Sequence, residues 1–203
     1  MKNILKETLV TRAVAFAARA HDGQFRKGTD VPYIFHPMEV AAITAGMTKD
    51  TRVIAAAVLH DTVEDTGATA KQIKKRFGPR VAELVAAESE NKRRDQRAED
   101  SWPVRKWETI EHLEHCTDRD VKILALADKL SNLRAIYRDY DNVGDKLWDR
   151  FNQKDPTMIG RYYVSFVGAC EELKEEPAMQ EYREILRRMG WADLPPLDPS
   201  VVK

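Results

Sequence analysis

Residues 51–65 read TRVIAAAVLHDTVED, and this stretch decides the fold of the chain. Its first nine residues are mostly apolar, and the preceding Asp50 is a good N-cap. The stretch therefore predicts a buried central helix, which Gly67 is expected to end. Its carboxyl end carries four polar side chains, which are His60, Asp61, Glu64 and Asp65.

These four polar groups are costly to bury unless a cation or a water-filled cleft receives them. On a helix, Glu64 lies one turn beyond His60, and Asp65 lies one turn beyond Asp61. If His60 and Asp61 bind a metal ion, the two later carboxylates are placed to handle protons on an attacking water or a leaving group. An exposed acidic last turn is the alternative interpretation of the same pattern.

Helical signals recur along the rest of the chain. Pro37 suits the first turn of a helix, Thr69 with Gln72 matches a capping box, and Gly78-Pro79 separates two helices. No run alternates in the manner of a strand, so the sequence predicts an all-α bundle of about ten helices. The other predicted helices cover residues 9–21, 37–46, 69–77, 79–90, 121–140, 143–153, 157–176 and 178–189.

Two segments lack helical periodicity. Residues 91–102, NKRRDQRAEDSW, are charged and are followed by Pro103, so they predict a mobile charged surface loop with a helix resuming after the proline. Such a loop serves either as a substrate lid or as a solvated connector. Residues 191–203 contain three prolines and are expected to be an irregular tail behind a domain formed by residues 1–190.

Composition narrows the class of protein. Lys+Arg and Asp+Glu are both 33 among 203 residues, so the net charge of zero argues against a dedicated nucleic-acid binder. No apolar run approaches the ~20 residues that span a bilayer, and the amino terminus has no signal-peptide pattern. Cys116 and Cys170 lack a disulfide or CxxC pattern. The sequence predicts a cytoplasmic protein with free thiols and no membrane partner.

Two further residues extend the candidate metal site. His36 stands just before Pro37, and Asp128 interrupts the apolar face of the helix predicted over residues 121–140. With His60 and Asp61 they supply two imidazoles and two carboxylates. This mixed set suits Mn²⁺, Fe²⁺, Co²⁺ or Zn²⁺ and suits Ca²⁺ or Cu(I) poorly. A water on such an ion has a lowered pKa and can attack phosphorus at neutral pH.

Three segments together carry a family resemblance. HDGQFRKGTDVPYIFHP at 21–37, LHDTVEDT at 59–66 and LALADKLSNLR at 124–134 resemble successive motifs of the HD-superfamily hydrolase domain of the RelA/SpoT alarmone enzymes. The chain is most similar to the stand-alone small alarmone hydrolases of that family. The resemblance implies an HD-domain helical bundle that removes pyrophosphate from the ribose 3′ position of ppGpp or pppGpp with one Mn²⁺ ion.

The resemblance also assigns roles to individual residues. It makes His36, His60, Asp61 and Asp128 the metal ligands, and it makes Glu64 and Asp65 the catalytic pair that orients or deprotonates the nucleophilic water. It places Arg26 and Lys27 against the base and phosphates of the nucleotide, and Asn132 against its sugar or a phosphate. Stacking by a guanidinium and a point charge for phosphate suit the first two assignments.

Several alternatives stay open at the level of sequence. Residues 86–110 replace the threonine-led segment typical of the family, so Lys92, Arg93, Arg94, Arg105 and Lys106 are candidates for phosphate contacts without an assigned role. The same site suits adenosine alarmones of the ppApp type or the ribose phosphate of NADPH. A nucleotide-sensing module without turnover is the alternative from a different class. The oligomeric state is left open.

Overall fold

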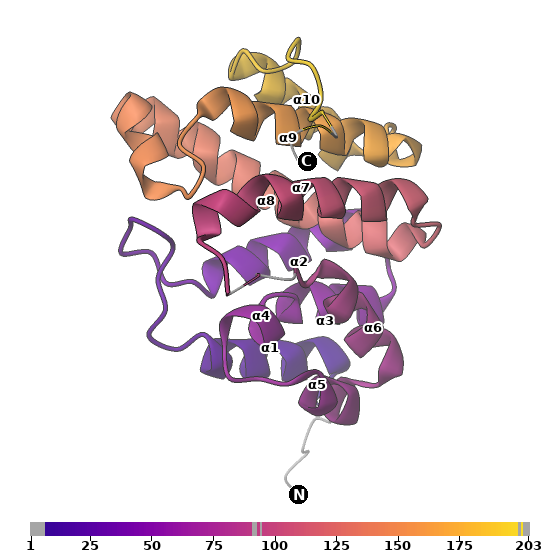
Figure 1. The fold of residues 1–203 in the computed structure, drawn as a ribbon. Coiled ribbons are helices and arrows are strands. Elements are labelled where there is room, and N and C mark those ends of the chain that lie inside the picture. The colour runs from indigo at the N-terminus through magenta and orange to yellow at the C-terminus, as the bar shows by residue number, and fades with distance from the viewer. Residues whose placement is uncertain (1–6, 91–92, 94, 199, 201–203) are drawn as a thin grey trace, which may run out of the picture. The chain divides into compact units, whose positions relative to one another are not determined.

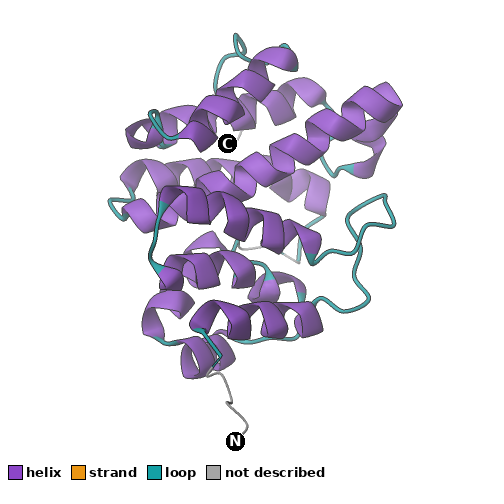
Figure 2. Cartoon of the chain, turned by 180° about the vertical axis from the view of Figure 1, so that it is seen from behind, coloured by secondary structure: helices purple, strands orange, loops and turns teal. Residues whose placement is uncertain are grey.

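The computed structural model describes residues 7–90, 93, 95–198 and 200, and this part of the chain is built from helices (Figures 1 and 2). It contains ten α-helices and two short 3-10 helices, and the single β-bridge found there joins Phe25 to Pro32. The predicted all-α fold is confirmed. The chain divides into two compact units, Met1–Ser89 and Glu90–Lys203.

The first unit is organised around its third helix. α3 (Thr51–Leu59) packs against α1 (Leu9–Ala20), α2 (Phe35–Met47) and α6 (Pro79–Glu88). Its side chains from Ala55 to Leu59 are fully buried, as expected of an apolar helix surrounded by others. The unit is completed by α4 (Thr62–Asp65) and by α5 (Ala70–Phe77), which packs against α6. The predicted central helix is therefore confirmed over its apolar part.

The prediction of one continuous helix over residues 51–65 is wrong, because a turn at His60 and Asp61 separates α3 from α4. His60 Nδ1 lies 2.8 Å from the carbonyl oxygen of Ala57, and Thr62 Oγ1 donates to the carbonyl of Leu59 at 2.6 Å. These side chains engage carbonyls that a continuing helix would bond through its own backbone amides. The break leaves the polar side chains next to a helix end.

The predicted caps of the first unit are present. Asp50 accepts a hydrogen bond from the backbone amide of Arg52 at 2.8 Å, and Thr69 with Gln72 forms the complete capping box of α5. Gly78 adopts φ 95°, a left-handed conformation that glycine reaches without strain, and Pro79 then opens α6.

We expect Thr69→Ala to lower the free energy of unfolding by about 1 kcal/mol, because it removes Thr69 Oγ1, which accepts a hydrogen bond from the backbone amide of Gln72 in the capping box. Thermal unfolding followed by circular dichroism should show a midpoint lower by about 2–4 °C. Lys71→Ala, on the exposed face of the same helix, is the matched control. Equal midpoints for the two variants would contradict a stabilising capping box.

The second unit consists of longer helices. α7 (Ala98–His115) packs against α9 (Pro156–Ala169), and α10 (Pro177–Arg188) packs against both α9 and α8 (Arg119–Val143). The 3-10 helices η1 (Gly144–Arg150) and η2 (Glu171–Leu173) stand where the sequence predicted α-helix over 143–153 and at the end of 157–176. Both predicted segments are therefore helical, but part of each is a 3-10 helix instead of an α-helix.

The start of α7 corrects the prediction that a helix resumes only after Pro103. The helix begins at Ala98, and Pro103 lies inside it. Trp102 is buried, with its ring 6.1 Å from that of Tyr162, so side-chain packing favours helix before the proline. Near the start of a helix, the proline removes only one of the backbone hydrogen bonds. Asn91, Lys92 and Arg94 of the predicted loop lie outside the described residues.

The tail that follows α10 contains no regular helix over residues 191–198, but it is packed. Trp191 and Leu197 are buried, and the backbone amide of Leu197 donates to Ser165 Oγ at 2.7 Å. A Cβ at Gly160 would lie 2.8 Å from Trp191, so the absence of a side chain there permits this packing.

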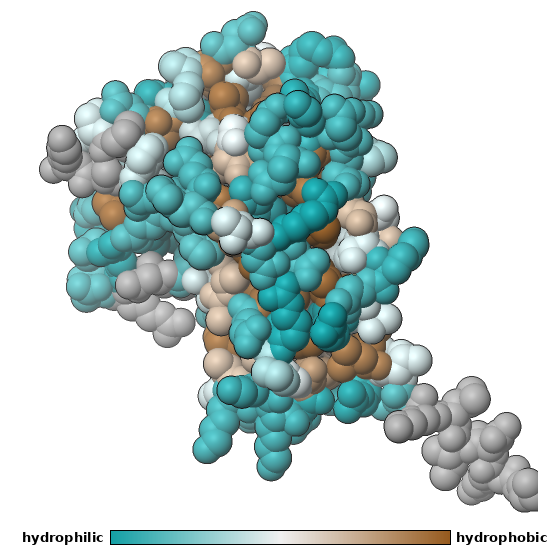
Figure 3. Space-filling model, turned by 90° about the vertical axis from the view of Figure 1, so that its right-hand side faces the viewer, coloured by the Kyte–Doolittle hydropathy of each residue, from teal (hydrophilic) through white to brown (hydrophobic). Residues whose placement is uncertain are grey.

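Hydrophilic side chains cover much of the surface visible in Figure 3, with smaller apolar areas between them. This distribution agrees with the one third of residues that are charged. None of the described helices combines the length and the apolar character needed to cross a bilayer.

Candidate metal centre

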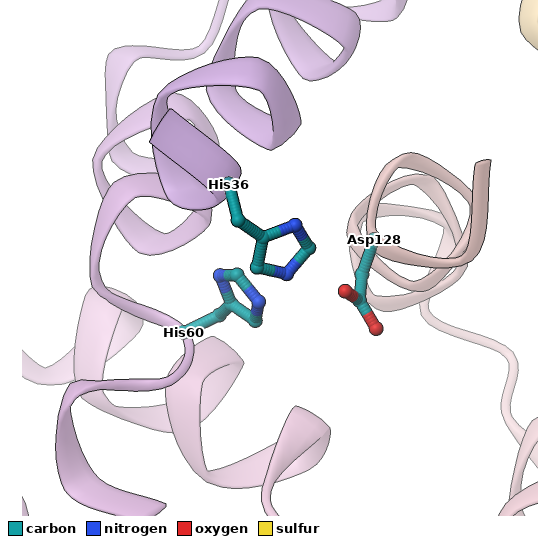
Figure 4. Close-up of side chains that lie close together, drawn as sticks. All are labelled: His36, His60 and Asp128. Atoms are coloured by element: carbon teal, nitrogen blue, oxygen red, sulfur yellow. The ribbon is translucent and has the colours of Figure 1, made fainter. Parts of the chain in front are cut away.

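Two buried histidines form the centre of the candidate site. His36 lies in the first turn of α2, and His60 directly follows α3. Both side chains are almost fully buried, and their ring centroids lie 5.2 Å apart with the ring planes at 72°. Figure 4 shows the two rings next to each other. Imidazoles paired in a core need a partner for their nitrogens, and a metal ion is a common one.

The third group of the first unit is Asp61. Its Oδ2 atom lies 3.0 Å from His60 Nε2 and 3.5 Å from His36 Nε2. Two ligand atoms that each lie at about 2.1 Å from one ion are separated by about 3 Å. The contact of His60 Nδ1 with the Ala57 carbonyl fits a tautomer in which Nε2 carries the lone pair. The three atoms therefore have the spacing and chemistry of ligands to one divalent metal ion.

The electrostatics keep Asp61 in its ligating form. Burial alone raises the pKa of this carboxyl, but the charge of His60 and hydrogen bonds from His36 and His60 outweigh that effect and bring the pKa well below its usual range. A carboxylate must be ionised to ligate a metal ion, and this environment keeps Asp61 ionised.

The next two carboxylates lie close by on α4. Glu64 and Asp65 are both half-buried. The backbone amide of Asp65 bonds the carbonyl of Asp61 at 2.9 Å, so the pair stays one turn beyond the first despite the helix break. The predicted spacing between the ligand and the two later carboxylates is thereby kept.

Sequence reasoning missed two residues around these carboxylates. Tyr33 donates its hydroxyl proton to Asp61 Oδ2 at 2.6 Å, and Gln24 Nε2 donates to the backbone carbonyl of Asp65 at 2.8 Å. Both residues come from the loop between α1 and α2, which has no periodicity that would indicate contacts. The recurrence of this loop in the first family motif is the one sequence signal that could have drawn attention to them.

The same loop positions the two predicted substrate-binding cations. The backbone amide of Arg26 bonds the carbonyl of Val31 at 2.8 Å, and Gly28 has φ 71° in the turn between them. The Arg26 guanidinium lies 5.7 Å from the centre of the Tyr33 ring, and Lys27 is exposed. Arg26 thus contacts the residue that holds Asp61.

Within the second unit, Asp128 lies on α8 and is buried. Its Oδ2 accepts from Lys129 Nζ at 2.5 Å, and its Oδ1 accepts from Asn132 Nδ2 at 2.8 Å. Asn132 therefore lies on the same face of α8 as Asp128. Asp128 is one of the side chains labelled in Figure 4.

Three of the cations considered for phosphate contacts, Arg93, Arg105 and Lys106, lie in ion pairs of the second unit. Glu90 bonds Arg105 Nη1 at 2.9 Å and Lys106 Nζ at 2.5 Å. Burial raises the pKa of Glu90, but the charges of Lys106, Lys129 and Arg105 and the hydrogen bond from Lys106 together outweigh burial and leave the pKa below its usual value. Arg93 pairs with Glu108. Each of these three cations therefore has a carboxylate partner within the second unit.

A family model described as an HD domain matches residues 13–157. Because the match covers more than half of the sequence, the chain belongs to the HD domain family, and the resemblance inferred from the three motifs is confirmed.

Particular relatives extend this result. The guanosine-3′,5′-bis(diphosphate) 3′-pyrophosphohydrolase MESH1 of Xenopus tropicalis is 41% identical over 133 residues, which are 64% of this chain and 70% of that protein. The GTP pyrophosphokinase rsh of Brucella ovis is 37% identical over 134 residues, which are 65% of this chain. This match spans only 17% of the length of the Brucella relative.

A solved structure is similar over almost the whole chain. It is described as a metazoan ortholog of SpoT that hydrolyzes ppGpp and plays a role in starvation responses. The TM-score is 0.74 at 26% sequence identity, and the match covers 92% of this chain and 98% of the other.

Proposed function

We propose that this chain is a Mn²⁺-dependent 3′-pyrophosphohydrolase that converts ppGpp and pppGpp to GDP and GTP with release of pyrophosphate. The observation that carries the proposal is the approach of His36 Nε2 and His60 Nε2 to one oxygen of Asp61. The relatives named for this reaction, and the neighbour described as hydrolyzing ppGpp, support the choice of substrate.

The proposed metal ligands are His36, His60, Asp61 and Asp128. The first three already have ligand-like spacing within the first unit, and the buried carboxylate of Asp128 has the chemistry of a fourth. A nitrogen and oxygen set of this kind suits Mn²⁺. When bound, such an ion lowers the pKa of a water molecule and offsets negative charge on a phosphate oxygen.

Glu64 and Asp65 are the proposed catalytic residues. Hydrolysis forms a bond between the water oxygen and the phosphorus nearest the ribose, and it breaks the bond from that phosphorus to the 3′ oxygen. The water must lose a proton and the 3′ oxygen must gain one. Two half-buried carboxylates one turn beyond the ligand Asp61 are suitably placed to accept and return that proton.

Arg26, Lys27 and Asn132 are the proposed substrate-binding residues. Arg26 presents a planar guanidinium that can stack on the purine, and the exposed Lys27 can pair with a phosphate. The Asn132 amide, which bonds Asp128, has a second N–H for a sugar or phosphate oxygen.

We expect Arg26→Ala to raise KM by about 3- to 30-fold with little change in kcat, since stacking on a cation of this kind contributes about 0.5–2 kcal/mol. Steady-state kinetics with ppGpp measures the effect. Arg19→Ala, at an exposed position of α1, is the matched control. If Arg26→Ala and Arg19→Ala have the same KM as the wild type, Arg26 does not bind the base.

We further infer the domain extent, the compartment and the partners of this hydrolase. Residues 1–190 act together as one hydrolase domain, because the family match extends across both compact units. Cys116 and Cys170 are free thiols, which supports a reducing compartment such as the cytoplasm. The proposed partner is the nucleotide substrate, without a nucleic acid or a membrane.

A substrate panel tests the function. Chelator-treated protein with and without added Mn²⁺ is given ppGpp, pppGpp, ppApp and NADPH, and both pyrophosphate and phosphate release are measured. The proposal requires Mn²⁺-dependent pyrophosphate release from the guanosine alarmones. Preference for ppApp would change the base, and phosphate release from NADPH alone would indicate a phosphatase. Metal binding without turnover of any compound would indicate a sensor.

A further inference from the structure

Tyr33 lies at the junction of the two carboxylate groups. Its hydroxyl is 2.6 Å from Asp61 Oδ2 and 3.3 Å from Asp65 Oδ2. Its ring packs edge-on against His36, with centroids 5.7 Å apart. One side chain thereby touches two of the proposed metal ligands and one of the proposed catalytic carboxylates.

The two distances indicate that the Tyr33 hydroxyl forms a stronger hydrogen bond with Asp61 than with Asp65. A phenol carries a single proton, and a bond of 2.6 Å to a carboxylate is a short, charge-assisted one, so the main donation goes to Asp61. The 3.3 Å contact with Asp65 is the weaker branch. Because a carboxylate oxygen of Asp61 and one of Asp65 both contact the Tyr33 hydroxyl, the position of Asp65 relative to Asp61 depends on Tyr33.

His21 and Gln24 form a second layer of contacts around Tyr33 and Asp65. The ring of His21 lies 4.9 Å from that of Tyr33, and His21 Nδ1 lies 2.7 Å from Gln24 Oε1. Gln24 in turn donates to the carbonyl of Asp65. His21 is buried and is the C-cap residue of α1, so this layer is anchored to a helix end.

We propose that Tyr33 is a positioning residue that fixes the metal ligand Asp61 and the water-handling carboxylate of Asp65 in one geometry, with Gln24 supporting Asp65. The inference rests on the proposed function for its catalytic part. Its metal-binding part stands on the contacts of the first unit alone.

Tyr33→Phe is the direct test, because it removes the hydroxyl and keeps the ring that packs on His21 and His36. Loss of a group that orients a metal ligand costs about 10- to 100-fold in metal affinity or activity. We expect Mn²⁺ affinity, measured by calorimetry on chelator-treated protein, to fall within this range. We also expect kcat for ppGpp to fall by at least tenfold with KM unchanged.

Two further variants sharpen the result. Gln24→Met removes the bond to the Asp65 carbonyl and the contact with His21 Nδ1, and it leaves the Tyr33 hydroxyl on Asp61, so it should lower kcat and leave Mn²⁺ affinity at the wild-type value. Tyr140→Phe removes an exposed hydroxyl that bonds Asp145 at 3.4 Å, and it should change neither quantity.

The outcomes separate this inference from the proposed function. If the wild type hydrolyses ppGpp and Tyr33→Phe matches it in both Mn²⁺ affinity and kcat, the positioning role is refuted. If the wild type hydrolyses no alarmone, the proposed function fails. The Mn²⁺ titration of Tyr33→Phe then still decides whether Tyr33 positions Asp61, because unchanged affinity would refute that role.

Discussion

Replacing Asp61 with asparagine is expected to lower Mn²⁺-dependent ppGpp hydrolysis by about 10³-fold or more, the largest effect of any single change considered. The substitution keeps the shape of the side chain and an oxygen that can accept from Tyr33. It removes the negative charge that two imidazoles stabilise. A metal centre supplies several kcal/mol of charge stabilisation, and each 1.36 kcal/mol is a factor of ten in rate.

The decisive readouts for Asp61→Asn are Mn²⁺ affinity and turnover measured on the same preparation. Asp30→Asn, at an exposed position of the loop between α1 and α2, makes the same chemical change away from the histidines. We expect the control to keep both properties. Wild-type affinity in Asp61→Asn would show that this carboxylate is not a metal ligand.

The second large effect is expected for the double variant Glu64→Gln with Asp65→Asn. General acid and base catalysis contributes about 10²- to 10⁴-fold, so kcat should fall by a factor in this range. Mn²⁺ affinity should stay near the wild-type value, because neither residue is a proposed ligand. The backbone contact between Asp65 and Asp61 is also unaffected by these side-chain changes.

The combination of lost turnover and kept metal is what distinguishes water activation from metal binding. Glu83→Gln with Asp30→Asn, both at exposed positions of the first unit, controls for the loss of two negative charges. Substantial turnover in the Glu64 and Asp65 variant would exclude the pair as proton carriers. Loss of Mn²⁺ affinity would instead assign them to the metal site.

Much of the fold could be predicted because apolar periodicity and caps act locally. The run that ends at Leu59 predicted a buried central helix, and Val53 and Leu59 are fully buried in α3. The break after Leu59 could not be predicted, because it depends on hydrogen bonds from His60 and Thr62 to carbonyls of the preceding turn. Periodicity contains no information on such bonds.

The start of α7 shows the limit of a local rule. Pro103 predicted a helix boundary from its missing amide hydrogen. Burial of Trp102 against Tyr162 depends on a residue sixty positions further along the sequence, and this contact outweighs the proline. Tertiary packing of this kind cannot be predicted from the local pattern of a single sequence.

The candidate site could likewise be predicted only in part. The residue types of His36, His60 and Asp61 suggested a metal centre, because imidazoles and carboxylates are unusual choices inside apolar helices. Tyr33 and Gln24 were not predicted, because both lie in a loop and reach α4 and its preceding turn across a long separation in sequence. Side chains that orient a ligand have no characteristic spacing of their own.

The most direct test of the central claim is a Mn²⁺ titration of chelator-treated wild-type protein with ppGpp present and pyrophosphate release followed. We expect no pyrophosphate release without metal and an activity that reaches its maximum at one Mn²⁺ ion per chain. Pyrophosphate release that persists at full rate after complete removal of metal would contradict a metal-dependent hydrolase.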